Sequence, residues 1–232
     1  MKYLIAILFS IPFMAFSQQL CEEPYQGWNC QPIEYFNDET IEIPEYPGCE
    51  IPVSYSVKVC TNGNDTKVFV NVTGYSIPSD CQQFKDDNEL PNGDPDWDFM
   101  DWFLYRAYEQ ISYDHFIEFY NDLTPSMKTY YECPSTYSMT YSFVMTHCTS
   151  IQVLIDYGPA GPYWKIETLK CTGDICCERT IAYCYNSSTE EVETTANSMT
   201  YLNGDCGEPD QPDPNAMWIS PCIEQCFIPQ KP

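Results

Sequence analysis

The chain has 232 residues, of which 34 are Asp or Glu and 10 are Lys or Arg, so its formal net charge at neutral pH is −24. A chain this acidic repels nucleic acid and anionic membrane surfaces, which leaves cations, basic proteins and neutral glycans as candidate partners. The simpler interpretation, that the charge only keeps the protein in solution, stays open. The length allows one or two domains with a hydrophobic core, and the oligomeric state stays unknown.

The amino-terminal segment is typical of an export signal. Residues 1–17, MKYLIAILFSIPFMAFS, combine a lysine, an apolar run and the small-residue ending Ala15-Phe16-Ser17. This pattern predicts a secretory signal peptide that is cleaved before Gln18. The apolar run ends after about sixteen residues, short of a bilayer span, and no later stretch reaches that length. We therefore expect a secreted, extracellular or periplasmic protein with no transmembrane segment after removal of the signal.

The cysteines all follow the expected cleavage site. Their even number in an exported chain predicts a disulfide framework, and their spacing leaves the pairing open. Structural zinc is the alternative, but the chain has only two histidines and lacks paired CxxC motifs. Each bridge typically stabilises a fold by about 2–4 kcal/mol. The fourteen expected disulfide cysteines are Cys21, Cys30, Cys49, Cys60, Cys81, Cys133, Cys148, Cys171, Cys176, Cys177, Cys184, Cys206, Cys222 and Cys226.

One stretch, residues 95–123, has apolar side chains at helical spacing over more than two turns. Asp94 followed by Pro95 predicts its start, with the Asp94 carboxylate as the cap and proline at the first helical position. The apolar stripe slips by about one residue near Ser112, which predicts a kink or a restart there. We expect this helix to cover a sheet, and an aromatic-lined ligand groove is the alternative.

Alternating apolar residues predict three hairpins, the first around an Asn-Gly turn. The three look alike, which suggests an internal repeat, although alternating strands also resemble one another by coincidence. A further alternation at residues 164–168 follows a Gly-Pro turn. The expected hairpins pair residues 53–59 with 68–72, 141–149 with 151–155, and 180–185 with 192–195.

These elements together predict an α+β fold made mainly of antiparallel β hairpins, stapled by disulfides, with one long helix around 95–123 that is either straight or kinked. We expect residues 18–232 to form one compact disulfide-rich domain after the signal peptide of residues 1–17. Two subdomains, 18–90 and 124–232, joined by the helix are the alternative arrangement.

A possible metal site lies at the start of the helix. Asp94, Asp96 and Asp98 have the alternate spacing of oxygen ligands in calcium loops. However, Phe99 stands where such a loop needs glycine, and Tyr105 stands where it needs the bidentate glutamate. Capping of the helix is therefore the preferred interpretation, and calcium is the alternative; no other cofactor is indicated. A vaguer acidic cluster in the tail comprises Asp205, Glu208, Asp210 and Asp213.

The sequence assigns no catalytic residue. His115 and His147 are the only imidazoles, and His147 falls on the apolar face of its expected strand. His115 follows Asp114, and such a pair can orient a general base, but no GxSxG motif accompanies it. Carboxylates on the expected exposed side of the helix could also act as glycosidase acids, although such a surface needs no catalytic explanation. These carboxylates are Glu109, Asp114, Glu118 and Asp122.

Two stretches and the helix between them resemble a known group of proteins. The stretches are Glu45 to Gly63 (EYPGCEIPVSYSVKVCTNG) and Cys171 to Asn186 (CTGDICCERTIAYCYN). They resemble uncharacterised exported cysteine-rich proteins of Bacteroidota, and the resemblance covers most of the mature chain. It implies the compartment and the origin, and it brings no function.

We therefore expect a secreted, disulfide-rich binding or structural module that is not an enzyme. Rigid hairpins and many Trp and Tyr side chains favour recognition of an extracellular glycan or a protein surface. A secreted hydrolase and a calcium-stabilised cell-surface adhesion protein are the two alternative functions.

Overall fold

The computed structural model describes residues 27–134, 139–146, 148–159, 161–172, 176–201, 207–224 and 231. The expected signal peptide therefore lies outside the described residues, as do Cys21, His147, Asp205, Cys206 and Cys226. Within the described strands, the side chains of Cys148, Cys176 and Cys177 are also outside the description.

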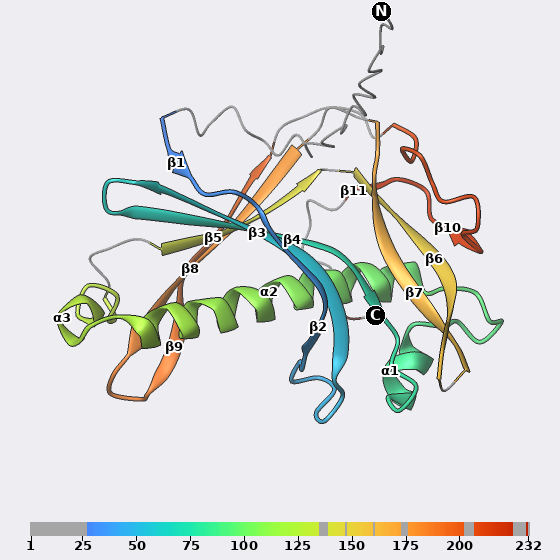
Figure 1. Ribbon diagram of the computed structural model, residues 1–232, viewed down its shortest axis with the longest axis horizontal. Coiled ribbons are helices and arrows are strands. Elements are labelled where there is room, and N and C mark those ends of the chain that lie inside the picture. Colours follow the sequence, from blue (N-terminus) through green and yellow to red (C-terminus); the bar gives the residue numbers. More distant parts are fainter. Residues whose placement is uncertain are drawn as a thin grey trace, which may run out of the picture.

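The described strands belong to one sheet, in which β4 and β5 are parallel and every other pair is antiparallel. Three helices accompany it, and the longest, α2, crosses one face of the sheet (Figure 1). The expected α+β class, mainly antiparallel β with one long helix, is thus confirmed. The elements are β1 (Asn29–Cys30), β2 (Glu34–Ile41), β3 (Ile51–Asn62), β4 (Asp65–Ser76), α1 (Gln82–Asp87), α2 (Trp97–Asp122), α3 (Pro125–Lys128), β5 (Met139–Thr146), β6 (Cys148–Gly158), β7 (Gly161–Lys170), β8 (Cys176–Asn186), β9 (Glu191–Tyr201), β10 (Trp218–Ile219) and β11 (Ile223–Glu224).

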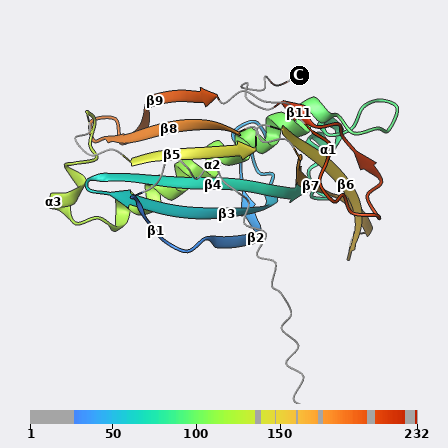
Figure 2. The same cartoon turned by 90° about the horizontal axis from the view of Figure 1, so that it is seen from above.

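The sheet divides into two wings along β4. One edge of β4 pairs with β3, while the other edge pairs with β5 over residues 66–69 and with β7 over residues 74–76. The strands β8 and β9 continue the β5 wing, and β6 continues the β7 wing (Figure 2). Gly74 makes the second pairing possible, because a Cβ at this position would lie 2.3 Å from the carbonyl oxygen of Ile166.

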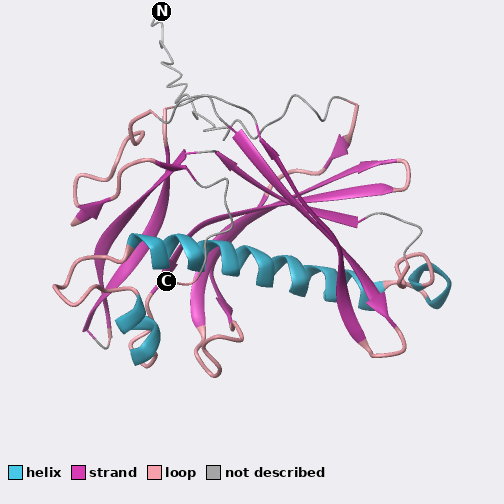
Figure 3. Cartoon of the chain, turned by 180° about the vertical axis from the view of Figure 1, so that it is seen from behind, coloured by secondary structure: helices cyan, strands magenta, loops and turns pink. Residues whose placement is uncertain are grey.

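The long helix α2 extends from the α1 side of the molecule to α3 (Figure 3). The side chain of Asp96 accepts a hydrogen bond from the Phe99 N–H at 3.0 Å, so Asp96 is the cap and the expected cap at Asp94 is wrong by two residues. The helix also continues unbroken through Ser112, so the expected restart is wrong. Residues 99–108 are buried almost consecutively, so the first half of the helix has no single apolar stripe. This explains why the apolar spacing in the sequence changes near Ser112.

Two of the three expected hairpins are confirmed. Strands β3 and β4 pair around the Asn-Gly turn, and β8 pairs with β9. The middle hairpin is wrong, because β5 pairs with β4 and β8, whereas β6 turns after Gly158 and pairs with β7. The suggested triple repeat therefore does not hold, because the second unit is not a hairpin. An alternating pattern tells which face of a strand is buried, but it does not identify the neighbouring strand.

The hydrophobic core lies between α2 and the sheet and is rich in aromatic rings. Around the start of the helix the rings of Phe84 and Phe103 lie 4.7 Å apart, and Tyr75 lies 4.5 Å from Phe103. Around its end, Phe116 packs against Tyr183 at 5.7 Å. Rings in these tilted and edge-on arrangements stabilise beyond the area that they bury.

Four disulfides connect elements that lie far apart in the chain. All eight cysteines whose side chains the structure describes are bonded, as expected, and the other six lie outside this description. The bridges tie β1 to β3, the loop after β2 to the start of α1, the segment after α3 to β8, and the end of β7 to the tail. The pairs are Cys30–Cys60, Cys49–Cys81, Cys133–Cys184 and Cys171–Cys222.

Candidate functional site

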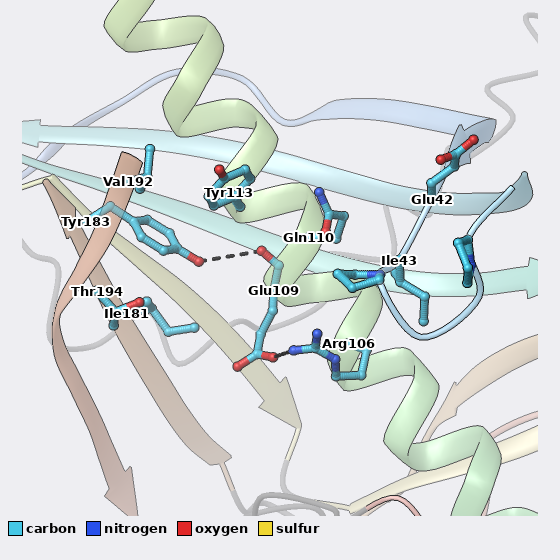
Figure 4. Close-up of a pocket in the computed structure, with 12 residues that line it drawn as sticks. Glu42, Ile43, Arg106, Glu109, Gln110, Tyr113, Ile181, Tyr183, Val192 and Thr194 are labelled. Atoms are coloured by element: carbon cyan, nitrogen blue, oxygen red, sulfur yellow. Dashed lines mark hydrogen bonds and ion pairs between the residues drawn. The ribbon is translucent and has the colours of Figure 1, made fainter. Parts of the chain in front are cut away.

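A pocket of about 730 Å³ opens where the middle of α2 meets β8, β9 and the loop that follows β2. Figure 4 shows its walls, which come from three separate parts of the chain. The loop contributes Glu42, Ile43, Pro44 and Pro47. Two prolines fix φ in this short loop, so its wall is stiff before any ligand binds.

Arg106 forms the polar centre of this pocket. Its Nη2 lies 3.0 Å from Glu45 Oε1 on the loop, and its Nη1 pairs with Glu109 Oε2 one turn further along the helix. Burial disfavours the charge on Arg106, but Glu109 and Glu45 outweigh this effect and raise its pKa. The guanidinium therefore joins the loop to the helix and positions the Glu109 carboxylate, which also accepts from the Tyr105 hydroxyl.

The contact between Arg106 and Glu45 uses one oxygen only. Arg106 Nε and Glu45 Oε2 are buried and have no hydrogen-bond partner among the described residues. A bidentate pair would satisfy both atoms, because guanidinium and carboxylate match as two parallel hydrogen bonds. The loop and the helix are therefore held together by a single charged hydrogen bond at this point.

The opposite wall of the pocket is aromatic and apolar. Tyr113 of α2 and Tyr183 of β8 pack edge to face, with ring centroids 6.3 Å apart. The Tyr183 hydroxyl donates to the Glu109 carbonyl oxygen at 3.5 Å, whereas Tyr113 lines the pocket and is 36% exposed. Ile181 and Val192 complete this wall from β8 and β9.

His115 lies outside the pocket and does not form the pair that could orient a base. Its Nδ1 lies 3.0 Å from the Tyr141 hydroxyl, and burial lowers its pKa. Asp114 instead accepts from Gln110 Nε2 at 2.9 Å. Of the helix carboxylates considered as acids, Glu109 lines the pocket, whereas Asp114, Glu118 and Asp122 are exposed.

The three aspartates of the possible calcium site have separate roles. Asp94 accepts from Asn92 Nδ2 at 2.7 Å, Asp96 caps α2, and Asp98 lies in its first turn. Among the described residues, the only three potential metal ligands with atoms within 4.8 Å of one another are the disulfide pair Cys133–Cys184 and Glu193. Calcium binding by the aspartates therefore stays a prediction, and it has no converging ligand set to support it.

Two acidic residues of the tail also make local structural contacts. Asp213 accepts from the Asn215 N–H at 2.8 Å, which is the hydrogen bond of a local turn. The Asp210 N–H donates to the Lys170 carbonyl oxygen at 2.7 Å, and this bond holds the tail against the end of β7.

A second aromatic surface lies near the tip of the β6–β7 hairpin. The rings of Trp164 and Trp218 lie 5.2 Å apart, and Ile155 stands opposite Trp164 in the sheet. Two residues along from Ile155, Tyr157 is 79% exposed.

Of the pocket residues, Glu109 was a candidate from the sequence, whereas Arg106 and the loop of residues 42–47 were not. One signal was present, because Arg106 is the only Lys or Arg in α2. A lone cation on a helix that is otherwise acidic and aromatic indicates a specific ion pair. Its partner Glu45 lies far away in the sequence, so the spacing of residues could not identify it.

Comparison with known protein families, curated proteins and solved structures gave no match. Within the described part of the chain, no helix has the length and apolar character needed to cross a membrane.

Proposed function

We propose that this protein is a secreted binding module that holds a neutral glycan in the pocket around Arg106. A single observation carries the proposal: the pocket combines two tyrosine rings with the ion-paired side chains of Arg106 and Glu109. The volume of about 730 Å³ is within the range of about 300–1,000 Å³ that is usual for small-ligand sites.

The two kinds of wall match the two kinds of surface on a sugar. The C–H faces of a pyranose ring are apolar and pack on aromatic rings, a contact that the exposed ring of Tyr113 offers while the buried Tyr183 supports it edge to face. Its hydroxyls both donate and accept hydrogen bonds, and the planar groups of Glu109, Gln110 and Arg106 offer acceptors and donors in fixed directions. This arrangement favours a polyhydroxylated ligand over a purely apolar one.

Charge supports a ligand without negative charge. Glu42 and Glu109 line the pocket and Glu45 pairs with Arg106, which is the only cation in the lining. The whole chain carries a formal charge of −24, which repels anionic ligands on approach. A sulfated or uronic-acid glycan is therefore a weaker candidate than a neutral one.

The loop wall is held in place before binding, which favours affinity because little order must be gained on association. The Cys49–Cys81 disulfide ties the end of this loop to α1, and the Arg106–Glu45 pair ties its middle to α2. Four disulfides among the described residues also suit a module that works outside the cell.

The proposal is tested by screening neutral oligosaccharides for binding and then titrating the best ligand by calorimetry. Tyr113→Ala should weaken binding by at least about tenfold, because it removes a stacking ring worth about 1.4 kcal/mol or more. Tyr113 is partly exposed, so this change leaves the core intact. Tyr157→Ala is the matched control, since it removes an exposed tyrosine of the second aromatic surface and should leave binding unchanged.

Two results would contradict the proposal. The absence of binding by every neutral oligosaccharide at millimolar concentration would remove the glycan, and loss of binding in Tyr157→Ala alone would move the site to the β6–β7 hairpin. The same panel checks the hydrolase alternative. Turnover of an oligosaccharide that disappears in Glu109→Gln would make the pocket an active site instead.

A further inference from the structure

Lys231, a described residue near the end of the chain, lies against two aromatic rings near the start of α2. The ammonium of Lys231 lies 4.7 Å from the ring centroid of Tyr46 and 5.3 Å from that of Trp102. It also lies 3.5 Å from Asp87 Oδ2. Figure 1 shows α1 beside the first turns of α2, where these groups come together.

These three groups come from three elements that are fixed to one another. Tyr46 lies on the loop after β2, Asp87 ends α1, and Trp102 lies on α2. The Tyr46 hydroxyl donates to the same Asp87 oxygen that faces Lys231, and burial together with this carboxylate raises the pKa of Tyr46. The Cys49–Cys81 disulfide joins the loop to the start of α1. The arrangement is therefore built by the fold and does not depend on the tail alone.

We propose that Tyr46, Trp102 and Asp87 form a binding cage for an alkylammonium group, and that Lys231 occupies it as an internal ligand. A cation near the faces of two rings is attracted by both ring quadrupoles, and the carboxylate adds a full opposite charge. A neutral group of the same shape gains neither interaction. The cage therefore selects for positive charge, and the ligand class is a primary or quaternary alkylammonium ion.

Lys231 sets how readily an external ligand binds. Lys231 is tethered to the fold by the Cys171–Cys222 disulfide upstream, so its effective concentration at the cage is high. An external ammonium must displace it, and removal of the lysine side chain frees the cage. This proposal does not depend on a glycan in the pocket around Arg106, because the cage lies on other residues.

The test measures choline binding by two-dimensional NMR of the oxidised full-length protein labelled with ¹⁵N-tryptophan. In Lys231→Ala, choline should shift the Trp102 indole signal and bind at least fivefold more tightly than in the unchanged chain. Lys231→Arg keeps the cation and should bind choline as weakly as the unchanged chain. Asp87→Asn added to Lys231→Ala should weaken choline binding again, because it removes the negative charge of the cage.

Two controls separate the cage from general effects of charge. Lys128→Ala removes a lysine that lies 4.9 Å from the Tyr120 ring at the other end of α2, and it should leave choline binding unchanged. The neutral isostere 3,3-dimethyl-1-butanol should not shift the Trp102 signal. The proposal is overturned if Lys231→Ala binds choline no better than the unchanged chain, if Lys128→Ala has the same effect as Lys231→Ala, or if the neutral isostere binds equally well.

Discussion

The two halves of α2 are built differently although they belong to one unbroken helix. In residues 99–108 buried side chains follow one another almost without a gap, whereas from Ser112 onward they recur every four positions, at Ser112, Phe116 and Tyr120. The first half packs against the sheet and also against α1 and the loop after β2, as the contacts of Phe84 and Tyr46 with Phe99 show. The second half has the sheet on one side only, and its other side is exposed.

The first half of α2 therefore mainly stabilises the fold, whereas the second half provides surface that a ligand can reach. The first half is enclosed by apolar and aromatic side chains, so it anchors the fold and fixes the cage around Lys231. In the second half, His115 contacts the Tyr141 hydroxyl and Tyr113 packs edge to face on Tyr183. The pocket lies at the junction, where the covering loop ends and an aromatic surface becomes accessible at Tyr113.

Truncation of a core ring should show the difference most strongly. Phe103 is fully buried between Phe84 and Tyr75, so Phe103→Ala should lower the free energy of unfolding by about 3–5 kcal/mol through lost burial and a cavity. Phe119 in the second half is only partly buried, and it packs edge-on against Tyr131 at 5.1 Å. Phe119→Ala should therefore cost about 1–2 kcal/mol. Denaturant unfolding of the oxidised proteins measures both, and equal costs would contradict the comparison.

The enclosed half of α2 carries a carboxylate whose pKa is strongly raised. Burial, and then the charge of Asp98, raise the pKa of Asp101 from 3.8 to about 7. Between about pH 4 and pH 7 the folded state therefore holds a proton that the unfolded state has released, so the destabilisation by this carboxylate is full above pH 7 and is relieved progressively as the pH falls from 7 to 4. Asp101→Asn should raise the free energy of unfolding at pH 8 by about 2 kcal/mol, roughly half of the upper bound set by the shift.

Asp98→Asn is the matched control, because it removes the neighbouring charge and should recover only a small part of this gain. In the second half of the helix, burial lowers the pKa of His115, so the unfolded state binds a proton more readily than the folded state. His115 therefore has the opposite effect on the free energy of unfolding, which decreases as the pH falls below about 6.5. Unfolding curves between pH 5 and pH 8 test both. If Asp101→Asn keeps the pH dependence of the unchanged chain, the buried carboxylate does not control it.

The elements of this fold were largely predictable from local patterns. Alternation located the strands on both sides of Gly63, and helical spacing located α2 to within two residues at its start. The partners of the strands were not predictable, because the division of β4 between β5 and β7 depends on the close approach of Ile166 to Gly74. No local pattern carries that information, since it joins residues far apart in the sequence.

The candidate sites depended even more on distant residues. The acidic run at Asp94 to Asp98 was the clearest local motif, and the structure uses Asp96 as a helix cap. The pocket around Arg106 needs Glu45 and Tyr183, and the cage around Lys231 needs three elements. Ion pairs and cation–π contacts of this kind follow from the tertiary fold, so the sequence could indicate only the lone arginine of α2.

Removal of single hydroxyls gives the finest test of the comparison. In the enclosed half, the Tyr75 hydroxyl donates to Asn88 Oδ1 at 2.5 Å, and Asn88 is fully buried. Tyr75→Phe leaves this oxygen without its donor and should cost about 1–2 kcal/mol. Tyr141→Phe removes the partner of His115 Nδ1, but His115 is only partly buried and can turn to water, so the cost should stay below about 1 kcal/mol. Denaturation at pH 7.5, where neutral His115 predominates, compares the two changes, and a larger loss in Tyr141→Phe would place the more rigid polar contacts in the second half.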